Sequence, residues 1–541
     1  MKPKILIIGL DAATMDLVEP WARAGHLPVL SGLMRDGTSC RFLSTPNMHS
    51  ASAWTSILTG LNPGRHGLYV FSDRDFTTGR VEFYKGGDRR GDLITRILAK
   101  SGLSCGLLNV PMTYPADSTG PGFAVSGLDA PALNEKAFCP PDLRADLFSR
   151  FPSYNFSPPG LGDLMRAGRV REAMESWLSL IEVQTSAAEY LLDSRPVHFF
   201  MTVFTASDWG GHNLWPAPNN TGRDLDDAPL RSIYQALDRS IGRLLRFSDE
   251  KTHCYVISDH GMGPHTGASY FIAEWLVEKG YMMRKNRPAS AASLLNTARN
   301  AARRALPGSV KERLKAGIGS ERLKQLQASE KDSFYGSIDW ERTAAYSEPG
   351  RHVININLRG RNQGGIVPQS EYDSLRDKVI ADLNKWTTED GNKVVDRVVK
   401  REEIYKGPFM ERASDLYIYW NPEARFGEPP AEVKARGFWW RGDHRPEGIL
   451  ICKGPGVRAS AKIDPPIVYD LVPTVIHLAG LPVPENLDGR VLVEVCTEQF
   501  ASANPIRYEG ITADGNEGAK VALSEGEEDA VAEKLRGLGY M

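Results

Sequence analysis

Three aspartates and three histidines stand directly after, or just before, short apolar runs of the chain. They are Asp11, Asp208, His212, Asp259, His260 and His444. Carboxylate oxygens and imidazole nitrogens are ligands that suit Zn²⁺, Mn²⁺ and similar divalent ions. Six such ligands divide into two sites of three and leave open positions for a nucleophile and for substrate oxygens. Two ions about 4 Å apart can hold the attacking and leaving oxygens of an in-line phosphoryl displacement, so the pattern predicts phosphoryl-transfer chemistry.

Each of these positions has an ordinary explanation when it is taken alone. An aspartate after an apolar strand is common in nucleotide-binding folds, and a neighbouring pair such as Asp259 and His260 is also found as a buried hydrogen-bonded pair. The joint appearance of such residues at the ends of several apolar runs is what favours a metal centre.

The segment 48–60 contains a candidate nucleophile, Ser50. It stands just before an expected short helix, 52–59, which Gly60 ends. Free amides and the dipole at a helix N-terminus favour an anion there. A serine hydroxyl needs activation before it attacks, and metal coordination is one way to supply it. The local pattern leaves open whether Ser50 is only a helix cap, and Ser52 competes for that role.

Strands and helices alternate along the chain and must position these residues. The expected strands are 4–10, 105–110, 198–204, 253–258 and 449–452, and the clearest amphipathic helices are 170–192 and 225–245. Alternating strands and helices predict an α/β fold with a mostly parallel sheet. Ligands of such sheets bind beyond the carboxyl ends of the strands, which is where most of the six residues fall.

Composition is that of an ordinary globular protein, with 41% apolar and 24% charged residues among 541. The net charge of -2 gives no overall attraction to nucleic acid or to an anionic membrane, so we expect no nucleic-acid partner. The first apolar run is too short for a signal peptide, and no run reaches the roughly 20 residues that span a bilayer. We therefore expect a cytoplasmic protein.

The six cysteines form no CxxC pair and are expected to be reduced. Nothing in the sequence indicates an oligomeric state.

One segment differs in charge from the rest. Residues 284–324 contain eleven basic and only two acidic residues, at helical spacing. A solvated helical insertion explains this pattern, and so does a basic cap or docking arm. The predicted division of the chain is 1–280 for the first part of the catalytic core, 281–335 for the basic helical insertion, 336–495 for the second part of the core, and 496–541 for a linker with a C-terminal helix at 525–538.

The chain resembles the alkaline phosphatase superfamily. The resemblance is carried by the strand ending at Asp11, the segments 58–67 and 258–262, and His444. It is strongest to the type I phosphodiesterase/nucleotide pyrophosphatase branch and its predicted phosphohydrolase/phosphomutase relatives, over about residues 1–280 and 336–492. It implies an alkaline phosphatase-like three-layer sandwich with a mostly parallel central sheet and a helical insertion.

The resemblance also implies the ligand sets. One metal ion would be held by Asp208, His212 and His444, and the other by Asp11, Asp259, His260 and the oxygen of Ser50. The ions would be zinc, with manganese as an alternative. Family spacing before Gly60 makes Ser50 rather than Ser52 the nucleophile, in a position where this branch usually has threonine. The implied enzyme is a metal-dependent phosphohydrolase that acts on a small phosphorylated or nucleotide-type substrate through a phosphoseryl intermediate.

Departures from the family bear on the substrate. Phe71 occupies the place of an asparagine that holds a phosphate oxygen in diesterases of this branch, so a phosphomonoesterase or a phosphomutase is the alternative. The sequence after Ser50 lacks the Pro and Arg of sulfatases. A non-catalytic scaffold is a third hypothesis. Further candidates for substrate contact are Arg359, Arg361, Arg445 and His265.

Overall fold

The structure is a computed structural model of the chain. It describes residues 1–117, 120–215, 229–285, 334–430, 433, 440–510 and 520–538. The basic segment lies outside these residues from position 286 onward. The predicted insertion and the proposed domain division therefore stay predictions.

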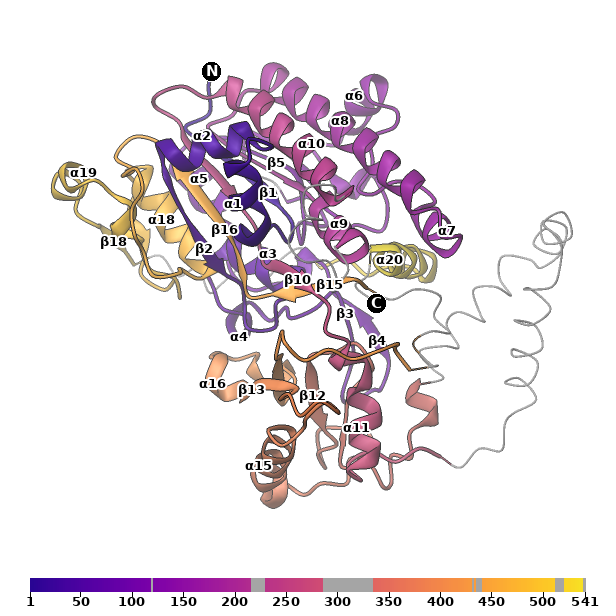
Figure 1. The fold of residues 1–541 in the computed structure, drawn as a ribbon. Coiled ribbons are helices and arrows are strands. Elements are labelled where there is room, and N and C mark those ends of the chain that lie inside the picture. The colour runs from indigo at the N-terminus through magenta and orange to yellow at the C-terminus, as the bar shows by residue number, and fades with distance from the viewer. Residues whose placement is uncertain are drawn as a thin grey trace, which may run out of the picture.

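An eight-stranded sheet forms the centre of the larger part of the molecule (Figure 1), in the order β2-β16-β9-β1-β8-β5-β6-β7. Its strands are β1 (Ile5–Leu10), β2 (Thr38–Leu43), β5 (Cys105–Val110), β6 (Phe123–Ser126), β7 (Phe138–Cys139), β8 (Phe199–Phe204), β9 (His253–Ile257) and β16 (Glu447–Lys453). The five strands from β9 to β6 are parallel, whereas β16, β2 and β7 join through antiparallel pairs. The predicted mostly parallel sheet is confirmed.

Both faces of this sheet are covered by helices, as alternate residues of β1 show. Leu6, Ile8 and Leu10 pack into one apolar cluster, and Ile5 and Ile7 into another. The first cluster includes residues of α1 (Met15–Arg23), α2 (Pro28–Asp36), α6 (Asp142–Arg150), α8 (Val170–Ser194), α9 (Ala206–Leu214) and α10 (Pro229–Leu244). The second includes residues of α3 (Ser50–Thr59), α5 (Ile94–Lys100) and α18 (Leu471–Leu478). A strand buried on both faces needs a continuous apolar run, and this is the three-layer sandwich that we expected.

A second sheet stands apart from the first (Figure 1) and has the order β11-β12-β14-β13. Its strands are β11 (Ala345–Tyr346), β12 (Val353–Ile356), β13 (Val395–Lys400) and β14 (Leu416–Trp420), all antiparallel, with α11 (Ile272–Glu278), α15 (Tyr372–Leu383) and α16 (Arg401–Ile404) beside them. Residues 268–282 and 334–420 share an apolar cluster of their own, and we call them the second lobe. Much of the predicted second part of the core thus builds this lobe, whereas β16 belongs to the central sheet and α18 packs on that sheet.

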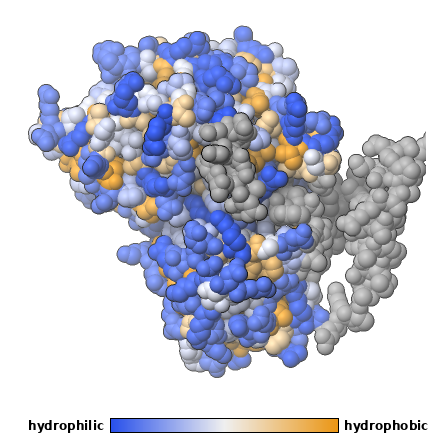
Figure 2. Space-filling model, in the orientation of Figure 1, coloured by the Kyte–Doolittle hydropathy of each residue, from blue (hydrophilic) through white to orange (hydrophobic). Residues whose placement is uncertain are grey.

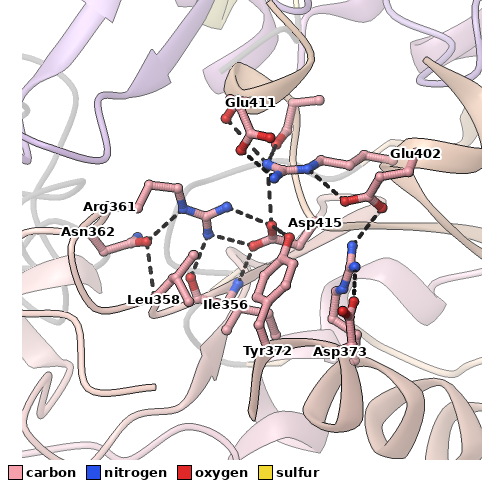
Figure 3. A network of polar contacts seen from close by, with 12 residues as sticks. Ile356, Leu358, Arg361, Asn362, Tyr372, Asp373, Glu402, Glu411 and Asp415 are labelled. Carbon is pink, nitrogen blue, oxygen red and sulfur yellow. Dashed lines mark hydrogen bonds and ion pairs between the residues drawn. The ribbon is translucent and has the colours of Figure 1, made fainter. Parts of the chain in front are cut away.

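A carboxylate buried in the second lobe, Asp415, organises a polar network (Figure 3). Arg361 donates to both of its oxygens at 2.6 Å, and the Tyr372 hydroxyl and the Ile356 amide also bond to it. Arg401 lies 3.5 Å from the same carboxylate. Arg361, a predicted substrate contact, is therefore held by an internal partner in this structure. Arg359 is exposed and donates to a backbone carbonyl of its own turn.

The C-terminal helix is present as predicted. It is α20 (Glu525–Leu538), and the backbone amide and hydroxyl of Ser524 donate to the Glu527 carboxylate at its start. Lys534 donates to the carbonyl oxygens of Leu128 and Ala130, which fixes the helix against the larger part of the molecule. Part of the expected linker is ordered, because β18 (Tyr508–Glu509) pairs with β17 (Val483–Pro484).

None of the helices among the described residues is long and apolar enough to cross a bilayer. Hydrophobic residues are scattered over the face seen in Figure 2 among many hydrophilic ones. All six cysteines are free thiols, as expected from their spacing.

Asp415→Ala should destabilise the protein, because it leaves the guanidinium groups of Arg361 and Arg401 buried without this carboxylate. Breaking a buried pair from one side costs about 3–5 kcal/mol, and the loss should appear as a lower midpoint of chemical denaturation. The control is Asp396→Ala, an exposed aspartate of β13 in the same lobe. Equal midpoints for the two variants would contradict the role of Asp415.

Candidate active site

Three adjacent strands of the central sheet deliver most of the predicted ligands to one edge. Asp11 follows β1, Asp259 and His260 follow β9, and Asp208 and His212 lie on α9, directly after β8. Because β9, β1 and β8 are parallel neighbours, their carboxyl ends meet at the same place.

His444 reaches this edge by a different route. It lies on β15 (Gly442–Arg445), which pairs antiparallel with β10 (Gly261–Pro264), the strand that begins right after His260. Met262 is the partner of His444 in this pairing. The pairing therefore brings His444 close to His260, which is far from it in sequence.

The side chains gather into two sets, and the candidate ligand atoms of each set lie within 4.8 Å of one another. The first set is Asp11, Asp259 and His260, all fully buried. In it, His260 Nε2 lies 3.3 Å from Asp259 Oδ2 and 3.7 Å from Asp11 Oδ1.

The second set is Asp208, His212 and His444. The Nε2 atoms of the two histidines lie 3.4 and 3.3 Å from Asp208 Oδ1 and 3.0 Å from each other. The rings of His260 and His444 lie with their centroids 3.8 Å apart, so the two sets are neighbours.

Backbone carbonyls fix the orientation of all three imidazoles. The Nδ1 atoms of His212, His260 and His444 bond to the carbonyl oxygens of Gly442, Gly261 and Met48 at 3.0, 3.0 and 2.7 Å. A carbonyl only accepts, so each Nδ1 carries the hydrogen and each Nε2 presents its lone pair to the site. Metal-bound histidines are held in this way.

The charges of the two sets fit divalent cations. Burial and the nearby carboxylates of Asp259 and Asp208 raise the pKa of Asp11 well above its usual value. Asp259 Oδ2 is buried without a hydrogen-bond partner, and the Nε2 atoms of His212 and His444 face each other at 3.0 Å. Burial lowers the pKa of His260 to about 4, which keeps its imidazole neutral as ligation requires. Carboxylates and lone pairs brought this close need shared positive charge.

Ser50 lies against the first set. Its Oγ is 3.3 Å from Asp11 Oδ1 and 3.0 Å from His260 Nε2. The helix α3 starts at Ser50, two residues earlier than predicted, and His49 caps it by accepting from the Ala51 amide. The Ser52 hydroxyl bonds to loop atoms instead. Neither serine is the cap, so the hydroxyl of Ser50 is left to the site.

The sequence matches, over residues 5–444, the family described as type I phosphodiesterase/nucleotide pyrophosphatase. The chain belongs to this family, which is part of the alkaline phosphatase superfamily. Membership indicates a hydrolase of phosphoester or pyrophosphate bonds. No curated protein matches the chain.

Solved proteins that share this fold are named for several different activities. Murine ectonucleotide pyrophosphatase/phosphodiesterase 5 is 12% identical, with a TM-score of 0.50 over 92% of this chain and 100% of its own. Phosphonoacetate hydrolase from Sinorhizobium meliloti 1021 is 14% identical, with a TM-score of 0.50 over 87% and 94%. Wild-type alkaline phosphatase PafA is 14% identical, with a TM-score of 0.52 over 92% and 99%. At these identities the likeness establishes the fold alone.

Three of the predicted substrate contacts, Phe71, Arg445 and His265, make contacts within the protein. Phe71 is buried and packs edge-on against His49, with ring centroids 5.3 Å apart. The Arg445 guanidinium donates to the carbonyl oxygens of His444 and Pro264 at 2.9 and 2.5 Å, so it braces β15 against β10. His265 stacks on a tyrosine ring 4.4 Å away.

Sequence reasoning missed a histidine of the second lobe and the aspartate that it contacts. Asp443 is buried on β15 beside His444. The Nε2 atoms of His352 and His265 lie 3.3 and 3.8 Å from its oxygens. Burial alone would raise the pKa of Asp443. The two nearby histidines outweigh this effect and hold the pKa of Asp443 well below its usual value. No motif marks His352, and only its place in the fold shows this contact.

Purified protein should contain two divalent ions per chain, and Asp259→Asn should remove one of them. The amide keeps the shape of the side chain but removes a charged ligand from the first set only. Metal analysis by mass spectrometry after dialysis measures the change, with the exposed Glu250→Ala as a control. A wild-type protein without bound metal, or an Asp259→Asn protein with the full content, would contradict the assignment.

Proposed function

We propose that the protein is a two-metal phosphohydrolase that cleaves a phosphate ester or pyrophosphate bond through a phosphoseryl intermediate. The observation that carries this proposal is the position of Ser50 Oγ, within 3.3 Å of both Asp11 Oδ1 and His260 Nε2. A serine hydroxyl placed inside a ligand set can be both nucleophile and ligand.

The residues that would hold the metals are those of the two sets, with Ser50 joining Asp11, Asp259 and His260. Bound divalent ions, zinc or manganese, would lower the pKa of the hydroxyl and stabilise negative charge on the phosphoryl oxygens. The donor set of carboxylates and imidazoles suits either metal.

The protein's own groups prepare the attack. Asp11 Oδ1 accepts a hydrogen bond from Ser50 Oγ, and the Trp54 indole donates to Asp11 Oδ2 at 3.2 Å. Trp54 needs Gly9 beside it, because a Cβ on Gly9 would lie 2.6 Å from the indole. The carboxylate is thereby oriented toward the hydroxyl, and the complete burial of Ser50 keeps bulk water from competing.

The reaction proceeds in two displacements. Ser50 Oγ gives up its proton and forms a bond to phosphorus while the bond to the leaving oxygen breaks. That oxygen departs with the electron pair and takes up a proton. Water then attacks the phosphoserine, releases the phosphate product and restores the hydroxyl.

Family membership supports a phosphodiester or nucleotide-type substrate. One observation favours the alternative of a phosphomonoesterase or phosphomutase. The place of the diesterase asparagine is taken by Phe71, whose ring is buried against His49 and offers no hydrogen bond to a phosphate oxygen.

Ser50→Ala should lower kcat by at least about a thousandfold, as removal of a nucleophile generally does. Both metal ions should remain bound, because each set keeps its three other ligands. Ser56→Ala is the matched control, since this serine of the same helix bonds to His66 away from the ligand sets. Turnover of Ser50→Ala near that of the wild type, on a substrate that the wild type hydrolyses, would contradict the proposal.

A further inference from the structure

A loop of the second lobe, residues 347–352, reaches the ligand cluster. His352 Nε2 lies 3.3 Å from Asp443 Oδ1, and Asp443 is the neighbour of the candidate ligand His444. The loop is held on its other side, where the Gly350 amide donates to the Ser269 carbonyl at 2.8 Å. Gly350 has a φ of +88°, which favours glycine at this turn. The position of residue 351 is thus fixed by contacts on both sides.

Arg351 in this loop is a mostly buried cation with one of its three guanidinium nitrogens hydrogen-bonded. Its side chain is 24% exposed, and its Nε lies 3.3 Å from Oε2 of Glu348, a buried carboxylate. Among the residues that the structure describes, Nη1 and Nη2 make no hydrogen bond. Glu348 therefore orients the group and leaves its two terminal nitrogens open as a fork.

The open fork lies beside the ligand cluster, because the next residue, His352, lies 3.3 Å from Asp443, and Asp443 precedes the candidate ligand His444. His444 Nδ1 bonds to the Met48 carbonyl at 2.7 Å, and His49 follows Met48 and caps the helix that begins at Ser50. Phe71 packs on the imidazole of His49. A charged donor thus stands in a loop that borders the same site in which Phe71 takes the place of the diesterase asparagine.

We propose that Arg351 is a substrate-binding residue whose Nη1 and Nη2 hold anionic phosphate oxygens of the substrate. This inference rests on the proposed function. A guanidinium pairs with phosphate through two parallel N–H···O bonds, and such charge-assisted bonds are stronger than neutral ones. The oxygens belong either to the reacting phosphoryl group or to a second phosphate beside it.

The test compares Arg351→Ala and Arg351→Lys with Arg342→Ala, in which an exposed arginine of the same lobe is lost. Each metal-loaded protein is assayed with p-nitrophenyl phosphate, bis-p-nitrophenyl phosphate and ADP, and its affinity for inorganic pyrophosphate is measured by calorimetry. Metal content and thermal unfolding of each variant establish that it is folded.

Arg351→Ala should lower kcat/KM about 10- to 100-fold and weaken pyrophosphate binding to a similar degree, the size of a lost charged hydrogen bond. Arg351→Lys should recover part of the loss, because it keeps the charge without the fork. Arg342→Ala should match the wild type. A loss with all three substrates assigns the oxygens to the reacting group, and a loss with ADP alone assigns them to a second phosphate.

Unchanged kinetics and unchanged pyrophosphate affinity in folded Arg351→Ala would overturn the inference while leaving the proposed function intact. A metal-loaded wild type that turns over none of the three substrates would instead count against the proposed function. In that case the pyrophosphate affinities of the wild type and of Arg351→Ala still decide the role of the arginine.

Discussion

Mutual repulsion of buried charge is the constraint on which this site depends. Three carboxylates and three imidazoles converge at one sheet edge as two sets, and the candidate ligand atoms of each set lie within 4.8 Å of one another. Such a cluster is costly to fold unless cations share it, because burial and neighbouring negative charge both oppose ionisation. The same repulsion makes the site reactive, since any cation that relieves it also attracts phosphoryl oxygens and acidifies the hydroxyl of Ser50.

The fold meets this constraint by building the ligands on rigid elements. Adjacent parallel strands fix the spacing of Asp11 and Asp259, and the pairing of β10 with β15 sets His444 against them. Backbone carbonyls then hold each imidazole by its Nδ1. The second lobe completes the surroundings through His352 and Arg351. The ligand residues at the edge of the central sheet are thereby connected to the second lobe, which has an apolar cluster of its own.

The candidate ligands could be predicted from sequence because five of them follow an apolar strand and His444 stands just before one, in recognisable motifs. Residues that act through tertiary contacts left no such signal. The contact of His352 with Asp443 and the pairing of Arg361 with Asp415 depend on partners that the chain brings near only on folding. Arg359 and Arg361 resembled a phosphate-binding pair in sequence, whereas Arg351, with its open fork, stood in no motif. Local pattern gives residue types, and only packing shows which charges are already satisfied.

The most direct test of the central claim is a search for phosphate on Ser50 during turnover. The metal-loaded wild type is mixed with substrate, quenched in acid within the first turnovers, and its peptides are mapped by mass spectrometry. We predict phosphoserine at Ser50 and at no other residue, forming before product release and decaying as substrate is exhausted. Sustained turnover without any phosphorylated Ser50, or with phosphate on a different residue, would contradict the account.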